Sequence, residues 1–365
     1  MRRLSGRIRP YAWGSRTAIA KLQGRPVPSD SPEAELWLGA HPGDPSTVGG
    51  ASLADLITAE PERLLGGEAV ARFGPRLPYL LKVLAAAAPL SLQAHPDAER
   101  ARERFALGHP GYVDGYHKPE LLVAVSEFEA LCGFRDPAAS AAALSTLDTP
   151  ALEPAVAALA GGGLRDAVGE LLALPSASVD QAAAAPRAPE LVRRLAADYP
   201  GDPGVLVALL LNHVTLAPGE AIWMPAGNLH AYLLGTGVEI MAASDNVLRG
   251  GLTPKHVDVP ELLHVLRFEV LADPVVRPEP VAPGVVTWPV PVAEFALHRV
   301  RPEGGSVELA APGPRVALCM TGAVTVGDGD GAVELSGGEA AFGGAGPAPV
   351  TFSGAGEAYL ASVPA

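Results

Sequence analysis

Three short fragments of this chain carry side chains that could share one metal ion. Gln93 and His95 are separated by one residue, so a strand would turn both side chains toward the same face. His230 follows residues 219–227, whose glycines and proline indicate a strand and a tight turn in front of the imidazole. An amide oxygen and two imidazoles, completed by a carboxylate, suit zinc or another borderline divalent cation, with a position left for water or substrate.

The pattern alone leaves the acidic ligand of this site open. Glu99 follows His95 in a charged, helix-compatible stretch, and Glu120 stands in the fragment Lys118-Pro119-Glu120. Such a fragment by itself is usually a surface loop with a solvated ion pair, so it does not single out Glu120. An isolated histidine is more often structural than metal-binding, and we expect a structural role for His109, His213, His264 and His298.

The elements that must position these residues predict a mainly β protein with a helical insert. Up to about residue 135, short β-like runs alternate with Gly and Pro, and residues 77–92 could be a buried strand that leads into Gln93. Residues 137–210 are rich in Ala, carry Leu at helical spacing and are interrupted by a triple glycine, which predicts helices. The predicted parts of the chain are residues 1–136, 137–210, 211–268 and 269–365.

Length, charge and cysteine content limit the class of function. A chain of 365 residues can bury a large core and should form two or three domains. The formal charge of −13 argues against binding nucleic acid, although a few cations inside a cleft still permit a small anionic substrate. The sequence shows no signal peptide and no bilayer-spanning stretch, and Cys132 and Cys319 imply no disulfide framework. We therefore expect a cytoplasmic monomer that binds neither nucleic acid nor membrane.

Two segments resemble the motifs of the cupin barrels. Residues 219–230 have the glycine, proline and histidine spacing of the second cupin motif, although Leu234 stands where an asparagine is common. Residues 93–99 resemble the first motif, with Gln93 in place of its leading histidine. The resemblance implies a jelly-roll barrel formed by residues 1–136 and 211–268 and interrupted by the helical insert of residues 137–210. Residues 338–342 faintly echo the glycine-led start of the second motif, which predicts a second, metal-free barrel in the C-terminal part.

A longer series of motifs resembles the type I mannose-6-phosphate isomerases. These motifs stand in the order of that family and are residues 11–14, 34–42, 90–97, 117–120 and 244–255. The resemblance implies one Zn²⁺ per chain with four ligands, Gln93, His95, Glu120 and His230. It thereby selects Glu120 over Glu99 as the carboxylate.

The same resemblance implies an aldose–ketose isomerase that interconverts D-mannose 6-phosphate and D-fructose 6-phosphate through an enediol. Arg249 takes the position of the family's catalytic arginine, and a salt bridge with Asp245 is its competing role. Candidates for the proton transfer are His117, Lys118, Asp245 and Glu239. Candidates for binding the sugar and its phosphate are Ser91, Lys82, Lys118, Lys255 and Tyr232.

Two other functions remain as alternatives on the sequence alone. An iron-dependent cupin oxygenase would need two histidines and one carboxylate around the metal, and the amide of Gln93 argues against that set. A non-catalytic sugar-binding cupin would be indicated by the loss of Arg249 or of a metal ligand, and the chain keeps these residues.

Overall fold

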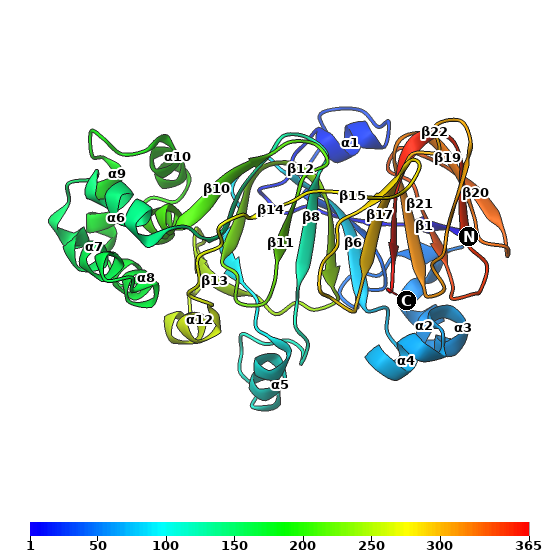
Figure 1. Ribbon diagram of the computed structural model, residues 1–365, viewed down its shortest axis with the longest axis horizontal. Helices are drawn as coiled ribbons and strands as arrows, with labels where there is room; N and C mark the ends of the chain where they lie inside the picture. The colour runs from blue at the N-terminus through cyan, green and yellow to red at the C-terminus, as the bar shows by residue number, and fades with distance from the viewer. Residues whose placement is uncertain (365) are drawn as a thin grey trace.

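Each predicted metal ligand lies on, or next to, a strand of one of two antiparallel sheets. The computed structural model describes residues 1–364, and within them each sheet contains 11 strands. The two sheets lie side by side, with a group of helices beyond the free end of the first sheet (Figure 1). The mainly β class with several helices is therefore confirmed. None of the helices within residues 1–364 is long and apolar enough to cross a membrane.

The first sheet contains the strands around the predicted metal ligands. Its strands are β2 (Arg7–Arg9), β3 (Glu35–Leu38), β6 (Tyr79–Ala86), β7 (Leu92–Ala94), β8 (Glu120–Ala124), β9 (Phe128–Phe134), β10 (Leu211–Leu216), β11 (Ala221–Met224), β12 (His230–Ala242), β13 (Leu248–Gly251) and β14 (Val275–Val276). The main path runs β14-β11-β8-β12-β6-β3-β2, and β7, β9, β10 and β13 join through further pairings.

Strand β12 connects two parts of this sheet because it bends within its length. Its first residues pair with β7 and β9, whereas the stretch from Gly235 onward pairs with β6 and β8. Gly235 has φ 126°, and a Cβ there would lie 2.6 Å from the carbonyl oxygen of Glu127, so the bend requires glycine. As a result one strand places His230 opposite Gln93 on β7.

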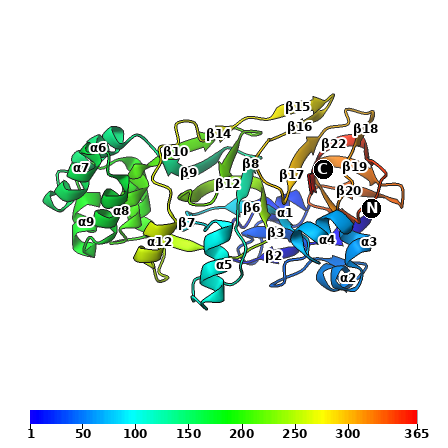
Figure 2. The same cartoon turned by 60° about the horizontal axis from the view of Figure 1, so that its bottom comes forward.

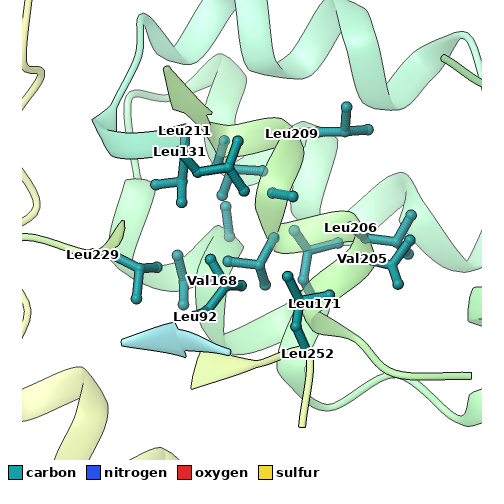
Figure 3. Packing of buried hydrophobic residues seen from close by; sticks show 14 of the residues in the cluster. Leu92, Leu131, Val168, Leu171, Val205, Leu206, Leu209, Leu211, Leu229 and Leu252 are labelled. Carbon is teal, nitrogen blue, oxygen red and sulfur yellow. The ribbon is translucent and has the colours of Figure 1, made fainter. Parts of the chain in front are cut away.

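The helical insert occupies the stretch in which Ala-rich sequence predicts helices. Its helices are α6 (Pro137–Ser145), η1 (Pro150–Leu152), α7 (Glu153–Ala160), α8 (Leu164–Leu172), α9 (Ser176–Ala183), α10 (Glu190–Asp198), α11 (Gly204–Val207) and η2 (Ala208–Leu210). Figure 3 shows how Val168 and Leu171 of this insert pack with Leu92 of β7 and with Leu229, which directly precedes β12. Each such fully buried side chain contributes about 2 kcal/mol, so apolar burial fixes the insert to the sheet.

The second sheet is built mostly from the C-terminal part of the chain. Its strands are β1 (Arg2–Ser5), β4 (Thr47–Val48), β5 (Ala51–Ser52), β15 (Glu279–Ala282), β16 (Val285–Thr287), β17 (Ala296–Val300), β18 (Ser306–Leu309), β19 (Arg315–Gly327), β20 (Ala332–Ser336), β21 (Ala340–Gly343) and β22 (Val350–Ser362). The remaining helices are α1 (Ala18–Leu22), α2 (Leu53–Ala59), α3 (Pro61–Leu65), α4 (Gly67–Phe73), α5 (Ala98–Ala106) and α12 (Val259–Val265). Figure 2 shows α2, α3 and α4 beside the second sheet.

Four strands cross the domain boundaries predicted from sequence. Three strands that the prediction places within residues 1–136, β1, β4 and β5, belong to the second sheet, where β1 pairs with β21 and β4. β14, which the prediction places in residues 269–365, pairs with β11 of the first sheet. The local sequence does not determine which distant segments pair as strands, so these pairings could not be predicted from it.

Candidate metal centre

Three buried side chains converge where strands of the first sheet begin or end. His95 follows β7, Glu120 opens β8 and His230 opens β12, and one ligand atom from each lies within 4.8 Å of the other two. Glu120 Oε2 is 3.2 Å from Nε2 of His95 and 3.2 Å from Nε2 of His230. The fragments that carry His95, Glu120 and His230 were predicted to share one metal ion, and in the fold they meet at one point, although His95 and His230 are more than a hundred residues apart in the sequence.

The hydrogen bonds of the two imidazoles leave both Nε2 atoms as acceptors in the neutral rings. His95 Nδ1 lies 2.8 Å from the carbonyl oxygen of Asn246, and His230 Nδ1 lies 3.1 Å from that of Asn228. A carbonyl oxygen can only accept, so each Nδ1 carries the proton and each Nε2 of a neutral ring carries a lone pair. Burial lowers the pKa of His95, which favours the neutral ring. Two lone pairs facing a carboxylate form a site for a cation.

Gln93, the amide ligand that the resemblance implies, lies on β7, where its backbone pairs with His230 and with Arg249. Its side-chain Nε2 donates to Ser91 Oγ at 3.3 Å, so the amide oxygen is the atom that can coordinate a cation. Gln93 lines a cavity of about 50 Å³ together with Glu120 and His230. Three of the four ligands that the resemblance implies therefore line one cavity, and the fourth, His95, contacts Glu120 of its lining.

Lys118 keeps the carboxylate of Glu120 charged and oriented. Its ammonium lies 2.8 Å from Glu120 Oε1, while Oε2 faces the two imidazoles. Burial alone would raise the pKa of Glu120, but the charge of Lys118 and the contacts with His95 outweigh it and hold that pKa well below its usual range. One oxygen is thus committed to the lysine and the other is directed at the centre.

A second buried network lies in the same cavity. Lys82 Nζ is 2.8 Å from Glu239 Oε2 and 3.5 Å from Glu35 Oε1, and the Tyr232 hydroxyl donates to Glu239 Oε1 at 2.7 Å. Burial would lower the pKa of Lys82, but the carboxylates of Glu239 and Glu35 more than compensate and raise it. Lys82, predicted as a phosphate ligand, is thus committed to two carboxylates.

Sequence reasoning did not single out Glu35 as a functional residue. It lies at the start of β3, where Trp37 Nε1 donates to its Oε2 at 2.8 Å, and only 6% of the residue is exposed. The available signal was an acidic residue inside the apolar run Glu35-Leu36-Trp37-Leu38. Buried carboxylates of this kind are rare unless paired, so that run could have indicated a partner lysine.

Arg249 and Asp245, two further residues predicted to belong to the site, are not among the residues that line this cavity. Arg249 is half-buried on β13, directly opposite Gln93 in the strand register, and burial lowers its pKa. The salt bridge with Asp245, considered as the competing role of Arg249, does not form, and the Asp245 carboxylate instead lies 3.1 Å from Nε2 of His41. The Asp245 side chain therefore stabilises the turn before β13 and leaves Arg249 for another partner.

The remaining candidates lie at the rim or outside it. His117 Nε2 is 2.7 Å from Glu294 Oε1, and Glu294 lies in the connection between β16 and β17 of the second sheet. Lys255 is exposed, and its backbone N–H donates to Thr253 Oγ1 at 3.2 Å. Glu99 is exposed in the first turn of α5, away from the ligand cluster, which agrees with the choice of Glu120.

Comparisons with known proteins agree with this architecture. The family model described as "Phosphomannose isomerase type I, catalytic domain" matches residues 1–137. The chain is 36% identical to the mannose-6-phosphate isomerase of Escherichia coli (strain K12) and 37% identical to that of Salmonella typhimurium, in each case over 98% of both chains.

A solved structure of a mannose 6-phosphate isomerase with zinc bound has a TM-score of 0.91 and 33% identity, and the match covers 100% of this chain and 99% of that one. A second structure, with zinc and yttrium bound, matches with a TM-score of 0.91 at 34% identity. The likeness thus includes both sheets and the helical insert. With relatives this similar along almost its entire length, the chain belongs to the type I mannose-6-phosphate isomerases, a family of enzymes.

Proposed function

We propose that this protein is a zinc-dependent mannose-6-phosphate isomerase that interconverts D-mannose 6-phosphate and D-fructose 6-phosphate. The observation that carries the proposal is the buried centre in which two imidazole Nε2 atoms face Glu120 Oε2. Relatives that match nearly the whole chain bear the name of this activity, and a zinc-bound isomerase shares the fold.

We assign Gln93, His95, Glu120 and His230 as the ligands of one Zn²⁺ per chain. Two neutral imidazoles, an anionic carboxylate oxygen and an amide oxygen form a mixed N/O donor set that fits zinc. The backbone carbonyls behind both imidazoles orient their rings toward the same point. When bound, the ion would supply Lewis-acid polarisation of a substrate oxygen.

We further propose Glu239 as the base that carries the proton between the two carbons. Its carboxylate lines the same cavity as Gln93, and Tyr232 and Lys82 fix its two oxygens from opposite sides. The proton leaves C2 of the aldose for Glu239 and returns to C1 of the enediol. The proton of the hydroxyl at C2 moves to the oxygen at C1, so the atoms balance. A positioned base of this kind contributes roughly 10²- to 10⁴-fold to the rate.

Lys118 is the candidate for moving the proton between the two substrate oxygens. Its side chain lines the cavity that holds Glu239, whereas His117 and Asp245 lie beyond the lining residues, beside Glu294 and His41. We therefore propose that His117 and Asp245 support the wall of the site and that Lys118 contacts the substrate.

Arg249 supplies the fixed positive charge in this proposal. Its backbone lies opposite Gln93 in the register of β13 and β7, so both side chains project from the same face of this strand pair. A cation aimed at the oxygen of the enediolate lowers the barrier by about 3 kcal/mol. For the phosphate we propose Ser91, which lines the cavity, and Lys255, which is free at the surface. We do not assign Lys82 to the phosphate, because its ammonium already pairs with the carboxylates of Glu239 and Glu35.

We propose that both sheets are cupin jelly-roll barrels, the first carrying the site and the second being metal-free. In support, β11 and β21 each start two residues after a glycine with positive φ, Gly219 and Gly338. This matches the echo between residues 219–223 and 338–342 in the sequence. In this proposal the helical insert of residues 137–210 interrupts the first barrel, and residues 211–268 complete it.

One assay tests the proposed function. Purified protein should form fructose 6-phosphate from mannose 6-phosphate, lose that activity with a chelator and regain it with zinc. Oxygen consumption without isomerisation would instead indicate the cupin oxygenase, and sugar-phosphate binding without turnover would indicate a binding protein. We also propose that the protein acts as a cytoplasmic monomer, since both cysteines, Cys132 and Cys319, are buried free thiols suited to a reducing compartment.

A further inference from the structure

Asn246 is a fully buried polar residue in the turn between β12 and β13, and the reaction described above gives its side chain no task. We propose that Asn246 is a positioning residue that orients His95 and aligns the three chain segments of the metal centre. The proposal rests on the zinc-dependent function above and adds a residue that touches neither metal nor substrate.

The first step is the backbone contact with the proposed ligand. The Asn246 carbonyl oxygen accepts the Nδ1 proton of His95 at 2.8 Å. This bond fixes both the tautomer and the tilt of the ring, so that Nε2 points toward Glu120 Oε2. A shift of residue 246 would therefore be transmitted directly to His95.

The second step is what holds residue 246 in place. Its carboxamide Nδ2 donates to the carbonyl oxygens of Asp114 and Tyr116, both at 2.8 Å. Its Oδ1 accepts from the backbone N–H of Val113 at 2.9 Å. Only an amide with this orientation satisfies two carbonyls and an N–H together, so the side chain is fixed in one pose. Asn246 thereby clamps the loop of residues 113–116.

The third step is a return contact from that loop. The Asp114 carboxylate accepts from the Ser244 hydroxyl at 2.9 Å and from the backbone N–H of Asp245 at 3.1 Å. Ser244 Oγ in turn accepts from the backbone N–H of Asn246 at 3.2 Å. The loop and the turn before β13 therefore hold each other through a closed set of hydrogen bonds.

These contacts link three parts of the proposed centre. The clamped loop runs directly into Lys118 and Glu120, and Arg249 follows Asn246 by three residues on β13. Through its carbonyl, its carboxamide and its place in the chain, Asn246 thus connects His95, Glu120 and Arg249. A small displacement at this residue would shift a ligand, the carboxylate that faces it and the arginine relative to one another.

The replacement Asn246→Asp tests the clamp because it preserves shape and changes chemistry. The carboxylate loses both N–H donors and places a negative charge against two carbonyl oxygens and the anionic Asp114. We expect the dissociation constant for Zn²⁺ to rise about 10- to 100-fold, as for other residues that orient ligands. We also expect a changed visible absorption spectrum of the Co²⁺-substituted protein, which reports ligand geometry independently of turnover.

Asn212→Asp is the matched control. Asn212 is a partly buried clamp, and its Nδ2 donates to the carbonyl oxygens of Leu271 at 2.8 Å and Cys132 at 3.2 Å rather than to the residues that hold His95. This variant should lose thermal stability to a similar degree while zinc affinity and the Co²⁺ spectrum stay as in the parent. Equal zinc loss in both variants would reduce Asn246 to a merely structural role and overturn the proposal.

Two further variants cover a failure of Asn246→Asp to fold. Ser244→Ala removes one hydroxyl contact with Asp114 and should raise the zinc dissociation constant several-fold, and unchanged zinc affinity in the folded variant would count against the clamp. Adding Asp114→Asn to Asn246→Asp removes the charge clash and should restore part of the zinc affinity.

The ring proton of His95 separates this inference from the proposed function. In metal-free protein with ¹⁵N-labelled histidine, the parent should show a slowly exchanging Nδ1 proton on His95, and Asn246→Asp should accelerate its exchange. If Asn246→Asp alters this exchange but the parent protein has no isomerase activity, the proposed function is wrong and the positioning role of Asn246 stands. Parent-like exchange, zinc affinity and Co²⁺ spectrum in Asn246→Asp would sink the clamp alone.

Discussion

At the residue scale, the two oxygens of Glu120 have different partners. Oε1 accepts from Lys118 at 2.8 Å, and Oε2 faces the two imidazoles. A carboxylate divided in this way cannot rotate without losing the lysine. The lysine therefore orients the proposed ligand as well as keeping it ionised, which a more distant charge could not do.

Replacing Glu120 tests which carboxylate completes the centre. Glu120→Gln should lower zinc affinity at least about 100-fold, because the anionic donor is lost and Lys118 is left buried without its partner. Zinc content and competition with a chromogenic chelator would measure the change. Glu99→Gln is the control and should bind zinc like the parent, because Glu99 is exposed on α5. The reverse result would restore Glu99 as the ligand.

Lys82 offers a second test at this scale. Lys82→Met keeps a long side chain but leaves Glu239 and Glu35 buried without a counter-charge. This loss should lower the unfolding free energy by about 3–5 kcal/mol. Urea unfolding would measure it. Lys21→Met, on the surface helix α1, should change stability by less than about 0.5 kcal/mol. A similar loss in both variants would contradict the buried network.

Much of the site was accessible from the sequence because ligand types and spacing are local signals. The Gln93 and His95 pair and the turn before His230 could be identified from spacing alone. The choice between Glu99 and Glu120 could not, because it depends on where β8 lies relative to β7. The contact of Asp245 with His41 was likewise hidden, since the partners lie about 200 residues apart in the sequence.

At the element scale, helices α5 and α12 are joined by one buried carboxylate. Glu261 on α12 accepts from Arg100 of α5 at 2.6 and 2.8 Å and from the Tyr112 hydroxyl at 2.6 Å. Burial would raise the pKa of Glu261, but the hydrogen bonds from Arg100 and Tyr112 prevail and lower it. The helix that follows His95 is thereby tied to the end of the first sheet.

This junction predicts a specific dependence of stability on pH. The folded-state pKa of Glu261 lies below its unfolded value of about 4.3, so the stabilisation is present above that pH. It is lost as the pH falls through the folded pKa. Glu261→Gln should lower the unfolding free energy by about 2 kcal/mol at pH 7. In urea unfolding experiments, the acid limb, which is the fall of this free energy below about pH 4, should be less steep than in the parent.

Glu103→Gln provides the control for that junction. Glu103 pairs with the same Arg100 at 2.8 Å, but at the surface, where an ion pair is worth less than about 1 kcal/mol. This variant should retain the parent's acid limb. An acid limb that flattens equally in both variants would show that Glu261 has no special part in it.

Element types were easier to predict from sequence than their partners. The Ala-rich stretch from residue 137 onward occurs as helices. Residues 77–92 are not one continuous strand, because β6 ends at Ala86, a loop follows and β7 begins only at Leu92. The break follows from Pro89, which has no backbone N–H to donate and therefore suits a connection better than a ladder.

At the scale of the whole molecule, the two sheets share one apolar core. A single cluster includes Leu81 and Val238 of the first sheet together with Val316 and Tyr359 of the second. The Tyr79 hydroxyl spans the junction, donating toward the carbonyl oxygens of Pro314 at 3.0 Å and Ala361 at 3.2 Å. The shared core argues against a hinge between the sheets.

We therefore expect the full chain to unfold in one cooperative transition, as followed by circular dichroism and calorimetry. Tyr79→Phe should lower the unfolding free energy by about 1–2 kcal/mol without splitting the transition. Tyr11→Phe, at an exposed tyrosine, should leave stability nearly unchanged. Two separate transitions in the parent would contradict the shared core.

The pairing of β1 with β21 has a consequence for how the protein is made. Arg3 lies opposite Ala341, so the ribosome releases β1 long before this neighbour exists. At about 5–20 residues per second, roughly half a minute separates the two strands. During that time the backbone N–H and C=O groups along one edge of β1 are unpaired and can form hydrogen bonds with strands of other chains. The nascent chain should therefore depend on chaperones more than its finished fold suggests, and slowed translation should increase its aggregation.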